Sequence, residues 1–542
     1  MPEHELPFAS RRSPVYALRG MVATSQPLAS QAGLEVLMQG GNAADAAVAA
    51  AAALNVTEPT STGLGGDCFA LFYDARTRTV SALNGSGRAP ALLTLDLLCQ
   101  QGFERELPPF HAHTITVPGA CAGWCDLIER HGRLPMTEVL APAIRLAEEG
   151  FPVAPLTAYF WQRGVERQLR RAPGGEALMV DGRAPRAGEV FRNPALARTL
   201  RLIAEGGKDA FYKGEIAERI AAAVQKAGGV MTVDDLAAHT STWEQPISTV
   251  YHGVRLYECP PNGQGLAALM ALNILKQVDL PPDPLSAERL HLLIEALRLA
   301  FADVRWYVAD PAFFAAPLDV LLSEDHARRR AQMINPAQAM PTPTHWMPVK
   351  GSDTVYLSVV DGEGNACSFI NSNYMGFGTG IVPQGTGFSL QNRGHGFSLD
   401  PSHPNALAPG KRPYHTIIPA MATREEDGSL YACFGVMGGF MQPQGHVQVM
   451  LALVTDGLDP QAALDRPRLC LENGTAGSVV ALEEGIPVPT MARLAEMGHA
   501  VRPVSGYARA IFGRGQIITR DPLSGVLCGG SDPRADGCAV GY

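Results

Sequence analysis

The chain contains 542 residues, of which 46% are hydrophobic and 18% charged, a composition typical of a globular protein that buries a large core without disulfides or metals. Its net charge of -9 offers no basic surface for nucleic acid or anionic lipid, so we expect a small-molecule partner, with no nucleic acid and no membrane. The ten cysteines lack the spacing of a zinc or thioredoxin motif and are expected to be reduced. Without a secretory signal or an apolar stretch long enough to span a bilayer, the sequence predicts a cytoplasmic protein.

An alanine-rich helix is predicted near the start of the chain, over residues 40–54, where small side chains allow close packing. The sequence GLGGD follows at Gly63 and precedes a predicted inner strand at 68–73. A dinucleotide-binding loop would place its glycines after a strand and in the order G-x-G-x-x-G, and neither condition is met. Tight backbone packing is therefore the expected role of these glycines.

A long helix is predicted after Ser286, with apolar side chains at helical spacing on one face and His291 and Glu295 on another. Two such residues one turn apart can bind a metal, but they more commonly form an exposed ion pair. We therefore predict a solvated ion pair here, and we assign no metal and no cofactor to the chain.

The most informative region begins after Ala337, where a stretch rich in proline and without periodicity predicts an exposed, weakly structured connection. It ends at Asp353, and the sequence TVYLSVVDGEGNACSFINS then predicts a β-hairpin that starts at Thr354 and turns at residues 361–365. β-Propensity alone explains a threonine at the start of a strand. An exposed linker, a threonine opening a buried strand and glycine-rich loops farther along together favour catalysis.

The chemistry that fits this pattern begins with a cut between Asp353 and Thr354. A threonine hydroxyl is a weak nucleophile, and the threonine's own α-amine can act as its base only when that residue is the amino terminus. The amine titrates at about pH 8, so a useful fraction is neutral at physiological pH. The simplest route is attack of Thr354 Oγ1 on the Asp353 carbonyl, which gives an ester that water hydrolyses. This predicts a large subunit, residues 1–353, and a small subunit, residues 354–542.

Seven sequence blocks, in order along nearly the whole chain, resemble those of the γ-glutamyltransferase family. They are GGNAADAAVAAAAALNVTEPTSTGLGGD at Gly40, VPGACAGW at Val117, APAIRLAEEGFPV at Ala141, DTVYLSVVDGEGNA at Asp353, FGTGI at Phe377, APGKRPYHTIIPA at Ala408 and GVMGG at Gly435. The resemblance implies an α/β fold, the four-layer αββα sandwich of N-terminal-nucleophile hydrolases, with a large and a small subunit cut from one precursor. It also implies amide hydrolase or acyltransferase activity.

The resemblance assigns four residues to catalysis: the nucleophile Thr354, the hydroxyl of Ser372 that supports it, and Gly438 and Gly439, whose N–H groups form the oxyanion hole. His415 and Thr416 occupy the place where transpeptidases of the family carry two serines that bind the substrate α-carboxylate. Thr416 can still donate a hydrogen bond there.

The departures from the family pattern concern the substrate. Where the family carries an arginine for the glutamyl α-carboxylate, this chain reads GSGRAP, with Ser86 in that place and Arg88 two residues on. Where the family carries polar and acidic residues for the α-amine, this chain reads QNRGHGF, with Arg393 and Gly396 in those places. Tyr374 replaces an asparagine of the second strand. We therefore expect a reshaped substrate pocket that includes these arginines and Tyr374.

These substitutions resemble those of γ-glutamyltransferase-like proteins, cephalosporin acylases and oxamate amidohydrolases. A lid loop looks absent between residues 397 and 411, so we expect an open pocket. The prediction is an autoproteolytically activated hydrolase of γ-glutamyl-type amides such as glutathione, in which hydrolysis outruns transfer and processed heterodimers can pair as homodimers. An acylase acting on a cephalosporin-acylase-like or oxamate-like amide, a cleaved but idle binding protein and an uncut structural protein stay open as alternatives. Arg393 pairs with a substrate carboxylate or is a structural arginine.

Overall fold

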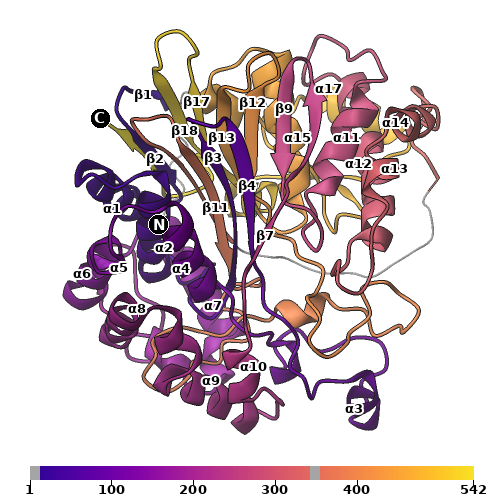
Figure 1. Ribbon diagram of the computed structural model, residues 1–542. Helices are drawn as coiled ribbons and strands as arrows, with labels where there is room; N and C mark the ends of the chain where they lie inside the picture. The colour runs from indigo at the N-terminus through magenta and orange to yellow at the C-terminus, as the bar shows by residue number, and fades with distance from the viewer. Residues whose placement is uncertain (1–11, 342–353, 476) are drawn as a thin grey trace.

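Two antiparallel sheets of seven strands each lie face to face at the centre of the protein (Figure 1). The computed structural model describes residues 12–341, 354–475 and 477–542. The first sheet has the strand order β19 (Cys538–Gly541), β2 (Met21–Thr24), β10 (Val355–Val360), β11 (Ala366–Ser372), β3 (Asp67–Asp74), β4 (Thr79–Gly85) and β7 (Thr242–Glu244). The second has the order β1 (Val15–Ala17), β18 (Leu527–Ser531), β17 (Arg514–Arg520), β13 (Leu430–Met437), β12 (Ala420–Arg424), β9 (Val254–Glu258) and β8 (Ile247–Tyr251).

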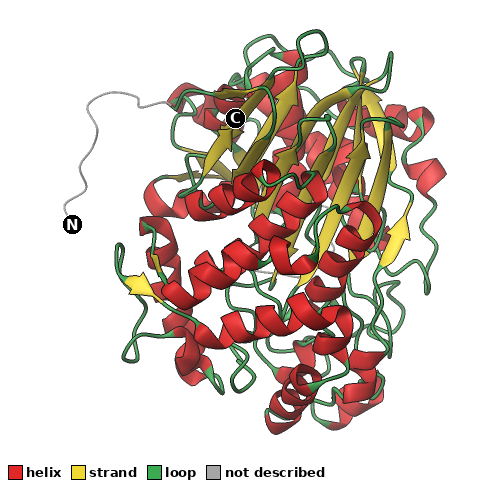
Figure 2. Cartoon of the chain, turned by 60° about the vertical axis from the view of Figure 1, so that its left-hand side comes forward, coloured by secondary structure: helices red, strands yellow, loops and turns green. Residues whose placement is uncertain are grey.

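Helices cover the outer face of each sheet, as the view in Figure 2 also shows. The first sheet is covered by α1 (Pro27–Met38), α2 (Ala43–Thr57), α4 (Ala120–His131), α6 (Ala141–Glu149) and α8 (Pro194–Tyr212). The second is covered by α11 (Leu266–Leu275), α12 (Ala287–Tyr307), α14 (Glu324–Ala331), α15 (Met441–Met450) and α17 (Val488–Glu496). Separate apolar clusters fill the two helix–sheet layers and the space between the sheets. The predicted four-layer αββα sandwich is confirmed.

Strand β10 shows how the sequence specifies these layers. Val355, Leu357 and Val359 belong to the cluster under the helices, whereas Tyr356 and Val360 belong to the cluster between the sheets. Successive side chains of a strand point to opposite faces, so a strand buried on both faces reads as an unbroken apolar run. The predicted hairpin is also present, because β10 pairs with β11 in antiparallel register.

The alanine-rich helix is α2, which is buried along its whole length. Asn42 caps it in a capping box with Asp45, which satisfies donors that the first turn leaves unpaired. The glycines that follow allow the close packing that the sequence predicts, since a Cβ on Gly66 would lie 2.2 Å from the Ser372 carbonyl oxygen. This contact brings the end of β11 against the start of β3.

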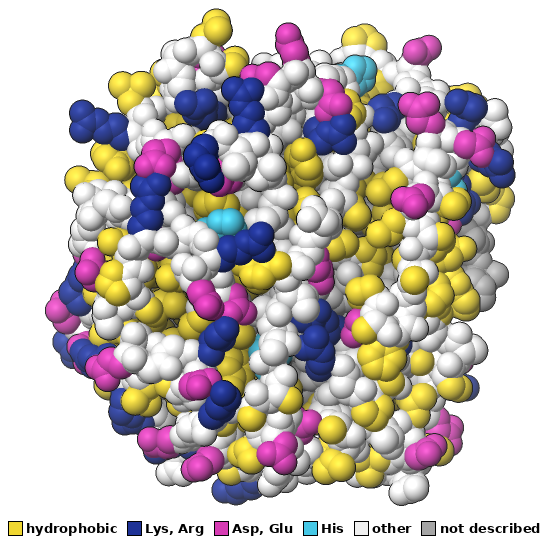
Figure 3. All heavy atoms as spheres, in the orientation of Figure 1, with side chains coloured by type: hydrophobic (Ala, Val, Ile, Leu, Met, Phe, Trp, Pro, Cys, Tyr) yellow, Lys and Arg dark blue, Asp and Glu magenta, His cyan; other side chains and the backbone are white. Residues whose placement is uncertain are grey.

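On the face shown in Figure 3, basic and acidic side chains are interspersed with apolar ones and do not gather into one large field of a single sign. Among the described residues, no helix is both long and apolar enough to cross a bilayer.

Candidate active site

Thr354 lies directly before β10 and is completely buried. By strand alternation its side chain points to the same side as Tyr356, into the space between the two sheets. Asp353, the predicted residue before the cut, lies outside the described residues. The structure thus confirms a buried threonine at the opening of a strand, and the cut itself stays a prediction.

Ser372, the last residue of β11, brings its hydroxyl beside that of Thr354. The two oxygens are 3.1 Å apart. Ser372 Oγ also accepts the backbone N–H of Tyr374 at 2.8 Å and the Nη2–H of Arg393 at 3.3 Å. These two donors fix the Ser372 oxygen next to the predicted nucleophile.

Arg393 contacts three other predicted site residues and joins them into one cluster. It lies in a short 3-10 helix, Arg393–Gly396, and is fully buried. Besides Ser372, its guanidinium donates through Nη1 to Thr416 Oγ1 at 2.7 Å and lies 4.2 Å from the ring centroid of Tyr374. Thr354, Tyr374 and Arg393 are all buried, and the expected open pocket stays a prediction.

The charge of Arg393 distinguishes it from the other buried arginines. Seven arginines are buried in the described part of the chain. Six of them form ion pairs with carboxylates: Arg289 with Asp456, Arg298 with Glu295, Arg412 with Glu244, Arg468 with Asp532, Arg514 with Glu58, and Arg534 with Glu483 and Asp532.

Arg393 has no such ion pair within the described residues, and its Nε has no hydrogen-bond partner there. Burial lowers its pKa to about 10, and the charge of Asp67 opposes that shift only from a distance. An unpaired cation and an unsatisfied donor are both costly in a protein interior. Together they mark a position where an anionic ligand would complete the structure.

Asp67 and His415 form a buried pair next to this cluster. The carboxylate Oδ2 accepts from His415 Nε2 at 2.9 Å, while Oδ1 accepts the N–H groups of Gly87 at 3.0 Å and Gly119 at 3.1 Å. Burial lowers the pKa of His415 to about 3, so the imidazole is neutral. Burial would raise the pKa of Asp67, but the hydrogen bond from His415 and the charge of Arg393 hold it below its ordinary value. Asp67 is thus the anion of this region, and the sequence interpretation of GLGGD missed it.

Gly438 and Gly439 connect the end of β13 to the start of α15. Their φ angles are 136° and 59°, values that favour glycine. Neither N–H donates to another group of the described chain, and both lie just before the helix N-terminus, where the helix dipole favours negative charge. These are the properties of an oxyanion hole.

The stacking of the two sheets places Thr354 near this glycine pair. Ser358 of β10 donates to the Cys433 carbonyl oxygen of β13 at 3.1 Å. Two residues closer to Thr354 on β10, and two residues farther along β13, a Cβ on Gly435 would lie 2.5 Å from the ring of Tyr356. The next step of two residues brings Thr354 to the end of β13, where Gly438 and Gly439 follow.

Gln264 links the glycine pair to the arginine cluster. Its Nε2 donates to the carbonyl oxygens of Gly439 at 2.8 Å and Thr416 at 2.6 Å. No local sequence pattern reveals that the Gln264 amide lies between two segments more than 150 residues away.

Arg88 and Ser86, from the GSGRAP sequence, lie outside the cluster around Arg393. Arg88 is half-exposed and donates to the Thr240 carbonyl oxygen at 3.2 Å, and no hydrogen bond or ion pair joins it to the other predicted site residues in the part of the chain that is described. Ser86 instead bonds to Asn84 Oδ1 at 2.7 Å. A short separation in sequence therefore did not bring Arg88 into the cluster.

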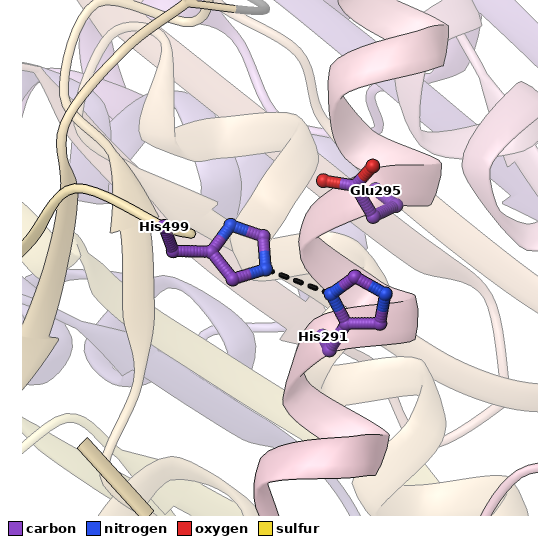
Figure 4. Close-up of side chains that lie close together, drawn as sticks. All are labelled: His291, Glu295 and His499. Carbon is purple, nitrogen blue, oxygen red and sulfur yellow. Dashed lines mark hydrogen bonds between the residues drawn. The ribbon is translucent and has the colours of Figure 1, made fainter. Parts of the chain in front are cut away.

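The predicted solvated ion pair of His291 and Glu295 is wrong. Both side chains are fully buried, because α12 is covered by neighbouring elements on nearly every side. His291 Nδ1 lies 2.8 Å from His499 Nε2, as Figure 4 shows, and Glu295 pairs with Arg298 at 3.1 Å. His499 is the neighbour that helical spacing could not reveal.

The four layers, with a buried threonine opening an inner strand and a pair of glycine N–H groups that have no acceptor among the described residues, define the fold of an N-terminal-nucleophile hydrolase. The profile of the gamma-glutamyltranspeptidase family matches residues 29–542, so the chain belongs to this family and is an enzyme of the same hydrolase and acyltransferase type.

Its relatives differ in their substrates. The chain is 39% identical to the glutathione hydrolase-like YwrD proenzyme of Bacillus subtilis, over 97% of this chain and 99% of that protein. It is 38% identical to the oxamate amidohydrolase proenzyme of Klebsiella pneumoniae, over 96% of this chain and 98% of that protein. The crystal structure of cephalosporin acylase from Bacillus halodurans superimposes with a TM-score of 0.93 at 48% identity and covers 99% of this chain and 98% of that chain.

Proposed function

We propose that the chain is an autoprocessed amide hydrolase in which Thr354, freed by a cut after Asp353, attacks amides whose acyl group carries a carboxylate. The observation that supports the substrate class is Arg393, a buried cation with no carboxylate partner among the described residues, one hydroxyl group away from Thr354. A substrate carboxylate would supply the missing counter-charge.

In this proposal the two parts of the precursor are residues 1–353 and 354–542. The new α-amine of Thr354 takes the proton of its own hydroxyl, and the hydroxyl oxygen attacks the amide carbonyl. The N–H groups of Gly438 and Gly439 stabilise the resulting oxyanion, and Ser372 holds Thr354 in position. The amine half of the substrate leaves with a proton, and water then hydrolyses the acyl ester on Thr354.

The spacing of the cluster favours a short acyl chain. Only the Ser372 hydroxyl separates Arg393 Nη2 from Thr354 Oγ1, with contacts of 3.3 Å and 3.1 Å. A reacting carbonyl carbon lies at about 3 to 3.5 Å from its nucleophile, and a bound carboxylate at about 2.8 Å from a guanidinium nitrogen. These distances fit a dicarboxylic acyl group of about two to five carbons.

A γ-glutamyl amide is the second candidate, because Thr416 provides a hydroxyl at the position of a family α-carboxylate ligand. Its α-ammonium, however, would lie close to the Arg393 guanidinium, and like charges in a buried site repel. The oxamate amidohydrolase among the relatives is named for a substrate whose acyl group lacks that ammonium, which supports this choice.

A matched set of substrates tests the proposal. Glutaryl-p-nitroanilide and γ-glutamyl-p-nitroanilide differ only in the amino group, and pentanoyl-p-nitroanilide lacks the carboxylate. We expect kcat/KM for the glutaryl compound to exceed that for the pentanoyl compound by about 100-fold, the value of a charge-assisted hydrogen bond pair. Equal turnover of the pentanoyl compound, or a preference for the γ-glutamyl compound, would contradict the carboxylate-without-amine assignment.

A further inference from the structure

A second arginine lies beside the candidate active site. Arg305, near the end of α12, places its guanidinium 3.9 Å from the ring centroid of Phe440 and 5.7 Å from that of Tyr414. Phe440 directly follows the glycine pair, and Tyr414 directly precedes His415. Arg305 therefore contacts the residues next to both segments that build the site.

The guanidinium is held in one orientation with one edge open. Arg305 Nη2 donates to the Asn473 carbonyl oxygen at 2.7 Å, and Nε donates to that of Gly474 at 3.3 Å. Nη1 donates to no acceptor in the described ranges, and it is not one of their buried unpaired atoms, so it reaches solvent. A pre-oriented guanidinium with a free N–H edge is suited to binding a carboxylate or a phosphate.

The charge of Arg305 is also uncompensated. It forms no ion pair with a carboxylate of the described chain, although most half-buried arginines of this protein do so, including Arg183 with Glu189 and Arg255 with Glu425. Burial raises the pKa of Tyr374, and the charges of Arg393 and Arg305 both oppose that shift, which indicates that the two cations lie near the same phenol.

The two arginines differ in depth. Arg393 is completely buried, whereas Arg305, near the end of α12, is partly exposed. In an amide held with its acyl carboxylate at Arg393, the amine half must leave toward solvent. We infer that Arg305 determines specificity by binding an anionic group on this leaving half, so that preferred substrates carry a second acidic group there. The inference rests on the proposed function.

A pair of leaving groups tests it. Glutaryl-p-nitroanilide and glutaryl-3-carboxy-4-nitroanilide differ by one carboxylate on the leaving amine. In the processed enzyme, Arg305→Met should raise KM and lower kcat/KM for the carboxylated substrate by about tenfold relative to its effect on the neutral one. Arg305→Lys, which keeps the charge, should restore part of this preference.

Arg130→Met is the matched control, because Arg130 also stacks on an aromatic ring, 4.2 Å from Trp243, but lies outside the site. This variant should leave kcat/KM unchanged for both substrates. Equal losses on both substrates in Arg305→Met, with a lower Tm, would show that Arg305 only tethers the 473–474 loop and would overturn the inference. An unchanged ratio would also overturn it while the proposed function stands. Failure of the unaltered enzyme to hydrolyse either compound would overturn both.

Discussion

Two buried polar clusters of this protein face the same cost of desolvation and differ in how their charges are paired. The cluster under α12 contains His291, Glu295 and His499, and its ligand atoms lie within 4.8 Å of one another (Figure 4). The cluster between the sheets contains Arg393 with Thr354 and its hydroxyl partners. Both combine charged and neutral side chains in a protein interior, so both must solve the same problem of desolvation.

The charged groups of the α12 cluster are paired within the protein, although Arg298 Nε and His499 Nδ1 are buried without hydrogen-bond partners among the described residues. His291 Nε2 donates to the Asn335 carbonyl oxygen at 2.8 Å, which leaves Nδ1 to accept from His499. The two oxygens of Glu295 accept from Arg298 at 3.1 Å and from the Met340 N–H at 2.9 Å. The residues that face one another as possible metal ligands are thus engaged in hydrogen bonds that hold the 335–340 segment against α12.

The cluster at Arg393 differs in its charge. Arg393 donates to the hydroxyl groups of Ser372 and Thr416 but forms no ion pair with a carboxylate of the described residues. A closed cluster stabilises a fold, whereas an open one lowers stability until a ligand fills it. Whether a buried charge has a partner within the protein therefore distinguishes a structural cluster from a ligand-binding one, whatever residue types the cluster contains.

The largest expected effect concerns chemistry. Thr354→Ala removes the only hydroxyl proposed to attack, so the chain should stay as one 57.7 kDa band on a denaturing gel, and hydrolysis should fall by at least about a thousandfold. Thr354→Ser is the control and should keep both reactions at reduced rates. A cleaved Thr354→Ala chain would contradict the assignment of the nucleophile.

The next prediction compares Arg393 with Arg534, an arginine that forms ion pairs with two carboxylates. Arg393→Met should lower kcat/KM for glutaryl-p-nitroanilide by about 100-fold and leave the free energy of unfolding unchanged or higher, because an unpaired buried cation is removed. Arg534→Met should instead lower the free energy of unfolding by about 3 to 5 kcal/mol, because Asp532 and Glu483 lose their partner. Urea denaturation of both variants measures this. Equal destabilisation would show that Arg393 is structural.

The sequence predicts the local parts of this picture and misses the contacts between distant segments. Strand alternation and the hairpin place Thr354 beside Ser372, since both lie within one short stretch of chain. Asp67 and His415 are 348 positions apart, and no periodicity relates them. Helical spacing does not predict the burial of His291 for a related reason. It shows which residues lie on the same face of a helix but not which elements cover that face.

A smaller effect is expected from the closed cluster. Glu295→Gln keeps the shape of the side chain but leaves Arg298 without a counter-charge, so the free energy of unfolding should fall by about 3 kcal/mol. The KM and kcat of the processed enzyme for glutaryl-p-nitroanilide should not change. A selective change in KM would show that the two clusters are coupled and that the distinction between them fails.

The smallest effect tests the property that the clusters share, a histidine kept neutral by burial. The pKa of His415 and that of His499 are each lowered to about 3, mainly by burial. An unfolded histidine binds a proton below about pH 6.5, so between pH 6 and 4.5 the unfolded state binds more protons than the folded state. Each histidine therefore makes stability fall with decreasing pH by up to about 1.4 kcal/mol per pH unit.

His415→Gln and His499→Gln should each reduce the slope of the free energy of unfolding against pH by the contribution of one histidine. Urea denaturation at several pH values measures this slope. The two variants should differ in activity, since only His415 lies beside Arg393, and kcat/KM should fall only in His415→Gln. An unchanged slope in both variants would mean that these imidazoles are protonated in the folded protein, and the electrostatic comparison of the two clusters would then be wrong.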